Sequence, residues 1–183
     1  MRVLFKKMFG EDSLMVTLKA PTHYKIIMGL FLLTLNIFVL IEQLYYQLGR
    51  LKVLKHARIY STAVNKPILN YGCDQTDYGH INTDVVPRDV PNFMLIAPSP
   101  KPTPFKDKAF GAAICSHVLE HVPDPETLRT ELRRVADQVF EVVPNPLFIL
   151  TWLCPNHLWV FIRGKAYRIR QHGPRLNGVI LDG

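Results

Sequence analysis

Two hydrophobic patterns divide the chain. Residues 26–41, IIMGLFLLTLNIFVLI, form a run of sixteen residues without a charge, in which Asn36 is the only strongly polar side chain. From Lys66 onward, short apolar runs alternate with turn residues. The first pattern predicts a helix that is apolar on all its faces, and the second predicts an α/β domain.

Five short apolar runs of this second region predict strands. They cover residues 67–71, 81–86, 93–96, 110–115 and 138–143. Each is followed by glycine, proline or another turn residue, which is typical of strands buried in a parallel sheet.

One helix is predicted after the fourth strand. Asp124 is suited to its N-cap, Pro125 to its first turn and Glu126 to the positive end of its dipole. Apolar residues at helical spacing predict a buried face, whereas the arginines are expected to face outward. The buried residues are Leu128, Leu132 and Val135, and the outward residues are Arg129, Arg133 and Arg134.

The order of these elements predicts an α/β, Rossmann-like domain with a mostly parallel sheet over residues 66–183. About eight residues separate the first two strands, too few for a crossover helix, so a loop is expected there. The residues after Pro146 suffice for two short strands, at 159–163 and 178–181, which makes the domain small or incomplete. The apolar run 147–153 is too short to span a bilayer; we expect it to pack in the core, with a hydrophobic lip at a membrane as the alternative.

The charge-free run predicts a membrane anchor. Extended to residues 26–48, it covers about twenty-three residues, and its charge-free core spans about 24 Å as a helix. Both flanks are basic, so they do not choose an orientation. We expect residues 1–25 to be a basic N-terminal segment and residues 49–65 to be a basic linker that rests on anionic lipid headgroups.

Three other interpretations of residues 26–41 compete with a membrane anchor. A cleaved signal peptide is disfavoured because the run begins late and no small-x-small site closes it. An interfacial helix is disfavoured because the apolar residues cover every face. A buried core helix stays open, because the run is shorter than a typical span.

The positive charge is concentrated near the N-terminus. The formal net charge of the 183 residues is +7, but residues 1–60 hold nine Lys and Arg against three Asp and Glu, and the rest hold thirteen against twelve. The nearly neutral domain does not favour nucleic-acid binding. Cys73, Cys115 and Cys154 are widely spaced and odd in number, so we expect free thiols and a reducing, cytoplasmic or matrix-like side for the domain.

Two segments carry a family resemblance. Residues 109–135, AFGAAICSHVLEHVPDPETLRTELRRV, resemble the fourth strand and following helix of class I S-adenosylmethionine (SAM)-dependent methyltransferases of type 11. Residues 69–84, LNYGCDQTDYGHINTD, resemble the first two strands of type 11 relatives that replace the first crossover helix with a loop. The resemblance covers about residues 67–146 and implies a methyltransferase fold.

The resemblance also implies a SAM site. It places Gly72 and Cys73 in the loop under the cofactor, Asp84 at the ribose hydroxyls, and Ser116 and His117 near the methionine end. His117 is in addition a candidate base, although methyl transfer driven by positioning needs none.

Three positions depart from the family pattern. Asp74 stands where a second glycine is expected. The segment 97–99, Ala-Pro-Ser, lacks the acid that binds adenine, and Gly111 replaces the Asp of a Phe-Asp pair. The SAM site is therefore expected to be degenerate.

The residues His117, Glu120 and His121 also match the inverted zinc-protease motif, His-x-x-Glu-His. That site needs a continuous helix and a further protein ligand downstream. Pro123 and Pro125 leave no continuous helix. We therefore predict no metal site and expect a structural role for His121.

Two functions follow. The first is a membrane-anchored SAM-dependent methyltransferase that acts on a small or lipid-like acceptor and contacts membrane lipids through residues 26–48 and their basic flanks. The alternative is a catalytically inactive, methyltransferase-like structural or interaction subunit at a membrane, which implies protein partners.

Overall fold

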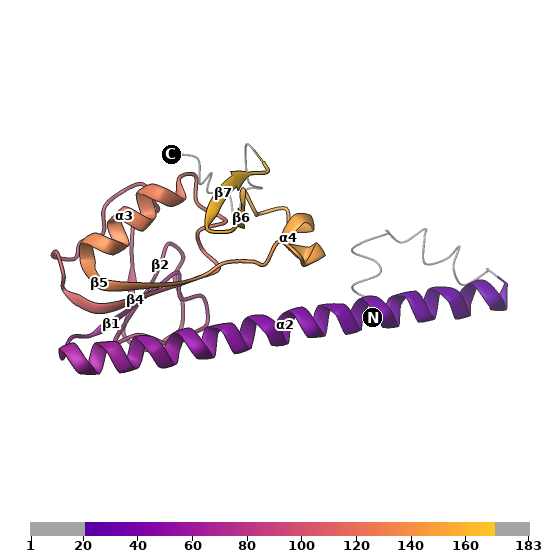
Figure 1. Cartoon of the computed structure of the whole chain (residues 1–183), viewed down its shortest axis with the longest axis horizontal. Helices are drawn as coiled ribbons and strands as arrows, with labels where there is room; N and C mark the ends of the chain where they lie inside the picture. Colours follow the sequence, from indigo (N-terminus) through magenta and orange to yellow (C-terminus); the bar gives the residue numbers. More distant parts are fainter. Residues whose placement is uncertain (1–20, 171–183) are drawn as a thin grey trace. The chain divides into compact units, whose positions relative to one another are not determined.

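A computed structural model describes residues 21–170, and the chain divides into two compact units between Tyr45 and Tyr46. In its described part, the first unit is the N-terminal portion of helix α2, which runs from Thr22 to Val64. The second unit contains the rest of α2 and an α/β domain (Figure 1).

The portion of α2 in the first unit contains a stretch that is long and apolar enough to cross a membrane. Its large apolar side chains are exposed on every face, for example Phe31, Leu33 and Phe38. The polar side chains of Thr34 and Asn36 donate hydrogen bonds to backbone carbonyls four residues earlier, at 2.9 and 2.6 Å. This pairing satisfies their donors without water, as an apolar environment requires.

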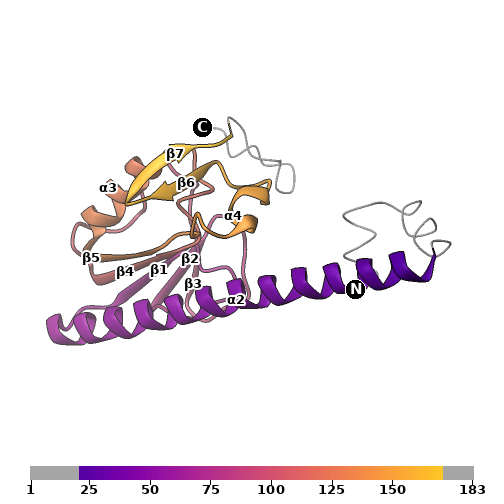
Figure 2. The ribbon, with the colours of Figure 1, turned by 45° about the vertical axis from the view of Figure 1, so that its right-hand side comes forward.

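The second unit is built on a five-stranded parallel sheet (Figure 2). Its strands are β1 (Ile68–Tyr71), β2 (Ile81–Asp84), β3 (Phe93–Leu95), β4 (Phe110–Ser116) and β5 (Ala136–Val142). Their order in the sheet is β3-β2-β1-β4-β5. The predicted Rossmann-like α/β fold with a mostly parallel sheet is confirmed.

Alternate residues of the central strands pack on opposite faces of the sheet. Leu69 and Ala113 belong to a core cluster with residues of α3 (Pro125–Val135). Ile68 and Ala112 belong to a second cluster, with residues of the C-terminal part of α2. Each face of the parallel sheet is thus covered by one helix, as such sheets require (Figures 1 and 2).

A loop replaces the crossover helix between β1 and β2, as predicted. Two buried asparagines tie it to the strands: Asn70 donates to the carbonyl of Thr76, and Asn82 donates to Asp77, at 2.9 and 2.8 Å. A Cβ at Gly79 would lie 2.5 Å from the carbonyl oxygen of Ile81, so only glycine lets the loop lie this close to the sheet.

The predicted linker at residues 49–65 is wrong, because α2 continues through this segment to Val64. Leu54, Ala57 and Ser61 are buried at spacings of three and four residues, so they form one face of the helix. Three basic residues of the segment, Lys52, Lys55 and Arg58, are exposed. The segment therefore belongs to the domain.

A β-hairpin follows the sheet and forms a separate two-stranded antiparallel sheet. It consists of β6 (Trp159–Ile162), where a strand was predicted, and β7 (Lys165–Arg168). The strand predicted at 178–181 lies outside the described residues.

Arg129 does not face outward as predicted. It is buried, pairs with Glu141 at 2.9 Å and lies over the ring of Phe161 in β6, 5.1 Å from its centroid. The hairpin covers this side of α3. The carboxylate of Glu141 and the ring of Phe161 replace the water that the buried guanidinium has lost.

The apolar run 147–153 does not pack in the core. It contains the short helix α4 (Ile149–Leu153), of which only Thr151 is buried. Leu147 is 89% exposed, and Ile149 and Leu153 are exposed as well. The structure therefore matches the alternative of an exposed apolar lip.

Replacing Leu54 with alanine tests whether the predicted linker is part of the core. Because Leu54 packs against Ile68, Ala112 and Ile114, Leu54→Ala should lower the free energy of unfolding by about 2–5 kcal/mol. Leu51 is exposed on the same helix, so Leu51→Ala should change it by less than about 0.5 kcal/mol. Denaturant unfolding of the full chain in detergent measures both; equal small effects would contradict the packing.

Candidate functional site

The predicted cofactor residues lie along one edge of the sheet, at the carboxyl ends of its strands. Gly72 and Cys73 follow β1, Asp84 ends β2, and Ser116 ends β4 with His117 after it. The strand order reverses between β1 and β4. Open α/β sheets bind ligands outside the strand ends at such a switch point.

The carboxylate of Asp84 is occupied mainly by donors of the chain itself. Its Oδ2 accepts hydrogen bonds from the backbone N–H of Asp74 at 3.1 Å and from Arg88 Nε at 3.2 Å. Its Oδ1 accepts one from the N–H of Val86 at 3.1 Å. A carboxylate has about four acceptor positions, so one remains.

Arg88 joins the two acids of this edge. Besides Asp84, it pairs with the carboxylate of Asp74 at 3.0 Å. Asp74 occupies the position of the missing glycine with φ of 47°, a conformation that Asp tolerates better than most residues. Arg88 was not among the predicted site residues, although an arginine four residues after a strand-end acid is a visible signal.

Gly72 is required by packing within the domain. It has φ of 69°, and a Cβ there would overlap Cγ2 of Val118 in the loop after β4. The N–H groups of Gly72 and Cys73 both donate to the carbonyl of Thr83, at 2.8 and 2.9 Å.

Cys73 does not offer its side chain to a ligand. It is only 1% exposed, and this burial, with the nearby Asp84 charge, raises the pKa of its thiol to about 11. At neutral pH the thiol stays protonated and is unreactive.

Ser116 and His117 point toward groups of the domain. Ser116 Oγ accepts a hydrogen bond from Arg50 Nε of α2 at 3.2 Å. His117 has φ of 56°, packs edge-on against Tyr46 and places Nδ1 3.2 Å from Oε1 of Glu120. Its Nε2 is buried with no hydrogen-bond partner among residues 21–170. The ring of His117 is therefore directed into the domain and is not positioned as a solvent-exposed general base.

The comparison with known families agrees with this geometry. A family model described as "Methyltransferase domain" matches residues 71–138, from the end of β1 into β5. The chain contains a class I methyltransferase-like domain. No curated protein and no solved structure matches the chain.

The family pattern has an aspartate at the position of Gly111, and packing within this domain explains why it is absent here. A Cβ at Gly111 would lie 2.8 Å from Cγ2 of Val64 and 3.2 Å from Cα of Ser61, both at the end of α2. An aspartate there has no space while α2 covers the sheet. After β3, Ala97 and Pro98 are exposed and offer no carboxylate to an adenine.

A group of metal-ligand side chains lies beside this edge. Glu120 and His121, in the loop after β4, meet His157, which comes just before β6. Burial lowers the pKa of His157, so its imidazole is neutral at physiological pH. The sequence analysis missed His157 because its contact with the loop is long-range.

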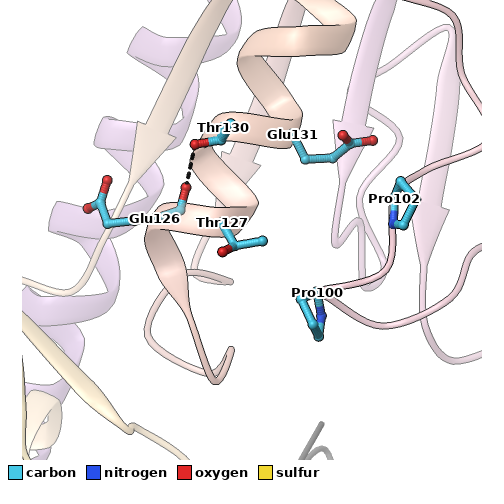
Figure 3. A pocket seen from close by; sticks show the side chains of 6 residues that line it. All are labelled: Pro100, Pro102, Glu126, Thr127, Thr130 and Glu131. Atoms are coloured by element: carbon cyan, nitrogen blue, oxygen red, sulfur yellow. Dashed lines mark hydrogen bonds between the residues drawn. The ribbon is translucent and has the colours of Figure 1, made fainter.

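A pocket of about 320 Å³ lies between α3 and the segment after β3 (Figure 3). It is lined by Pro100, Pro102, Glu126, Thr127, Thr130 and Glu131. None of the predicted cofactor residues lines it. The acid Glu131 is already committed, since it accepts hydrogen bonds from Thr103 and pairs with Arg134 at 2.7 Å.

Glu131 gives the domain a defined acid sensitivity. Its hydrogen bonds with Arg134, and then with Thr103, lower its pKa from 4.5 to about 2. Because the pKa is lower in the folded state, the stability from the ionised carboxylate is present above about pH 4.5 and is lost as the pH falls toward 2.

The variant Glu131→Gln should therefore be less stable than the wild type above pH 4.5, with the difference shrinking between pH 4.5 and 2. Thermal unfolding of the full chain across this range measures the effect. Asp89→Asn, which removes an exposed acid, is the control and should show no such convergence. A pH-independent difference for Glu131→Gln would contradict the ion-pair assignment.

Proposed function

We propose that the chain is a membrane-anchored SAM-dependent methyltransferase that acts on a small or lipid-like acceptor. The observation that carries this proposal is the position of Asp84, at the end of β2 beside the switch point of the sheet and within the matched residues. A carboxylate in this place accepts hydrogen bonds from the two hydroxyls of a nucleoside ribose.

Ribose binding requires Arg88 to leave Asp84. One acceptor position of the carboxylate is free, and release of Arg88 Nε makes a second one available for the ribose diol. The sulfonium and ammonium groups of SAM are positive, so they compensate Asp74 once Arg88 has moved. Arg88 thus competes with the cofactor for the same acids.

The alternative function is an inactive methyltransferase-like subunit. It is supported by the side chains of the domain itself, which occupy the edge of the sheet where a cofactor would bind. Val118 fills the space next to Gly72, Arg88 pairs with both acids, and no carboxylate follows β3 at residues 97–99. In that case the domain keeps the fold for its stability and contacts protein partners through its surface.

The membrane part of the proposal is supported by two apolar surfaces, each in its own unit. The first is the exposed stretch of α2, with its basic flanks suited to anionic lipids. The second is the exposed lip of Leu147, Ile149 and Leu153, which suits a lipid-like acceptor or a bilayer surface. The free cysteines of the domain agree with a reducing, cytoplasmic or matrix-like, side.

Calorimetric titration of SAM into the full chain in detergent tests the cofactor. Binding should weaken about 10- to 100-fold in Asp84→Asn, because hydrogen bonds to a charged group are lost. It should strengthen in Arg88→Ala, because the competitor for the carboxylate is removed. Asp89→Asn, an exposed acid five residues along the chain, should bind like the wild type.

Absence of binding heat at millimolar SAM, in both the wild type and Arg88→Ala, would exclude the enzyme and favour the inactive subunit. Binding that is unaffected by Asp84→Asn would remove the ribose site from β2. Far-UV circular dichroism of each variant verifies that it is folded.

Carbonate extraction of cell membranes tests the anchor. The wild type should stay in the membrane pellet. The double variant Leu33→Lys with Ile37→Lys should be released, because two lysines at the helix centre cost about 5–7 kcal/mol together. Leu51→Lys with Ile59→Lys is the matched control, since both residues are exposed on α2 but lie outside the charge-free run; equal release of both variants would contradict a span at residues 26–48.

A further inference from the structure

Three side chains of metal-ligand type meet where the loop after β4 contacts the segment before β6. One ligand atom each of Glu120, His121 and His157 lies within 4.8 Å of the others, and His121 Nε2 is 3.8 Å from Oε1 of Glu120. The two segments are joined at the backbone, because the N–H of Leu158 donates to the carbonyl of Glu120 at 2.7 Å. The group is thus part of a defined contact in the fold.

Both imidazoles are oriented by backbone carbonyls. His121 Nδ1 lies 2.9 Å from the carbonyl oxygen of Asn156, and His157 Nδ1 lies 2.8 Å from that of Thr151. A carbonyl oxygen only accepts, so each Nδ1 carries the proton and donates it. In a neutral ring, Nε2 then holds a lone pair, which is the arrangement that prepares a histidine to bind a metal ion.

Glu120 completes the set with a buried carboxylate that accepts no hydrogen bond within residues 21–170. The residue is 0% exposed, and neither of its oxygens accepts a hydrogen bond from any described part of the chain. Burying a carboxylate without partners is costly. His117 Nδ1 lies 3.2 Å from Glu120 Oε1 but does not form a hydrogen bond with it. The lone pairs of His121 and His157 add no donor, so a cation held by these groups would balance the carboxylate.

We propose that Glu120, His121 and His157 bind one divalent transition-metal ion of the zinc class. A set of two imidazole nitrogens and one carboxylate oxygen suits zinc and its neighbours, whereas calcium and magnesium prefer sets of oxygen ligands alone. Zinc bound at about 2.0–2.2 Å places its ligand atoms about 3.4 Å apart, so the widest pair must close by about 1.4 Å. The positive charge of the ion balances the negative charge of the buried carboxylate.

This site differs from the inverted zinc-protease arrangement that the sequence analysis rejected. Glu120 is a ligand here instead of a base, and the downstream ligand is His157 of another segment. A continuous helix is not needed, because the loop after β4 and the start of the hairpin bring the ligands together. Three protein ligands leave one tetrahedral position open, and the side chain of His121 is 30% exposed, so water reaches this side.

The metal content of the full chain tests the site. The chain is purified in detergent with a tag that contains no histidine, and Zn, Fe, Co, Ni and Mn are measured by mass spectrometry. We expect about one ion per chain, a melting temperature that falls with EDTA and recovers with Zn²⁺, and visible absorption of the Co²⁺-loaded protein. None of these measurements involves SAM, so the result is independent of the proposed function.

Matched variants assign the ligands. His157→Ala and the isosteric Glu120→Gln should bind Zn²⁺ more than about tenfold more weakly and lose the thermal response, whereas His56→Ala, an exposed histidine on α2, should keep both. Wild-type protein without metal and without a thermal response to Zn²⁺ would overturn the proposal, as would unchanged metal binding in Glu120→Gln. If His157→Ala does not fold, the Co²⁺ spectrum of the wild type decides, since a spectrum without imidazole ligation would also overturn it.

Discussion

The fold depends on the need to cover both faces of a parallel sheet. Strand β1 presents Ile68 to one face and Leu69 to the other, and β4 repeats this alternation with Ala112 and Ala113, so neither face tolerates water. A class I domain normally covers both faces with crossover helices. Here the first crossover is a loop, and the C-terminal part of α2 takes over that layer. The same helix also carries the apolar stretch near the N-terminus.

This substitution changes the chemistry that the sheet edge can hold. Because α2 ends against β4, Gly111 has no room for the acid that relatives place there. Asp74 adds a negative charge in the first loop, and Arg88 pairs with it and with Asp84. One guanidinium against two carboxylates leaves this edge with one net negative charge. A cofactor that binds Asp84 through its ribose has to displace Arg88 first. In this the domain differs from one in which the ribose-binding carboxylate is exposed.

Local patterns predicted the elements of the domain well. The N-cap is one example: Asp124 accepts hydrogen bonds from the N–H groups of Glu126 and Thr127, and Pro125 opens α3 as expected. The strands were found because apolar runs bounded by turn residues are a short-range signal. The five residues predicted to bind the cofactor lie at one edge of the sheet, since the ends of parallel strands share one side. Their role in cofactor binding stays a prediction.

The predictions from the sequence were wrong where contacts between distant residues decide the burial or the partner of a side chain. Arg129 looks like a surface residue by its spacing, but Glu141 and Phe161 approach it from other elements. In residues 49–65, basic side chains obscured the narrow apolar face of Leu54 and Ala57. His157 could not be linked to Glu120, because no sequence signal connects residues that are 37 positions apart.

The place of α2 in the chain also orders the building of the domain. The helix ends at Val64, before β1 begins at Ile68, so the ribosome delivers it ahead of every strand within residues 21–170. The apolar face of Leu54 and Ala57 is then present when β1 and, more than forty residues later, β4 emerge. Nascent strands meet a ready surface in place of solvent or other chains, which protects a sheet whose pairing is slow and aggregation-prone. A circular permutant with α2 at the C-terminus would keep the packing of Leu54 and Ala57 on the sheet but would lose this protection.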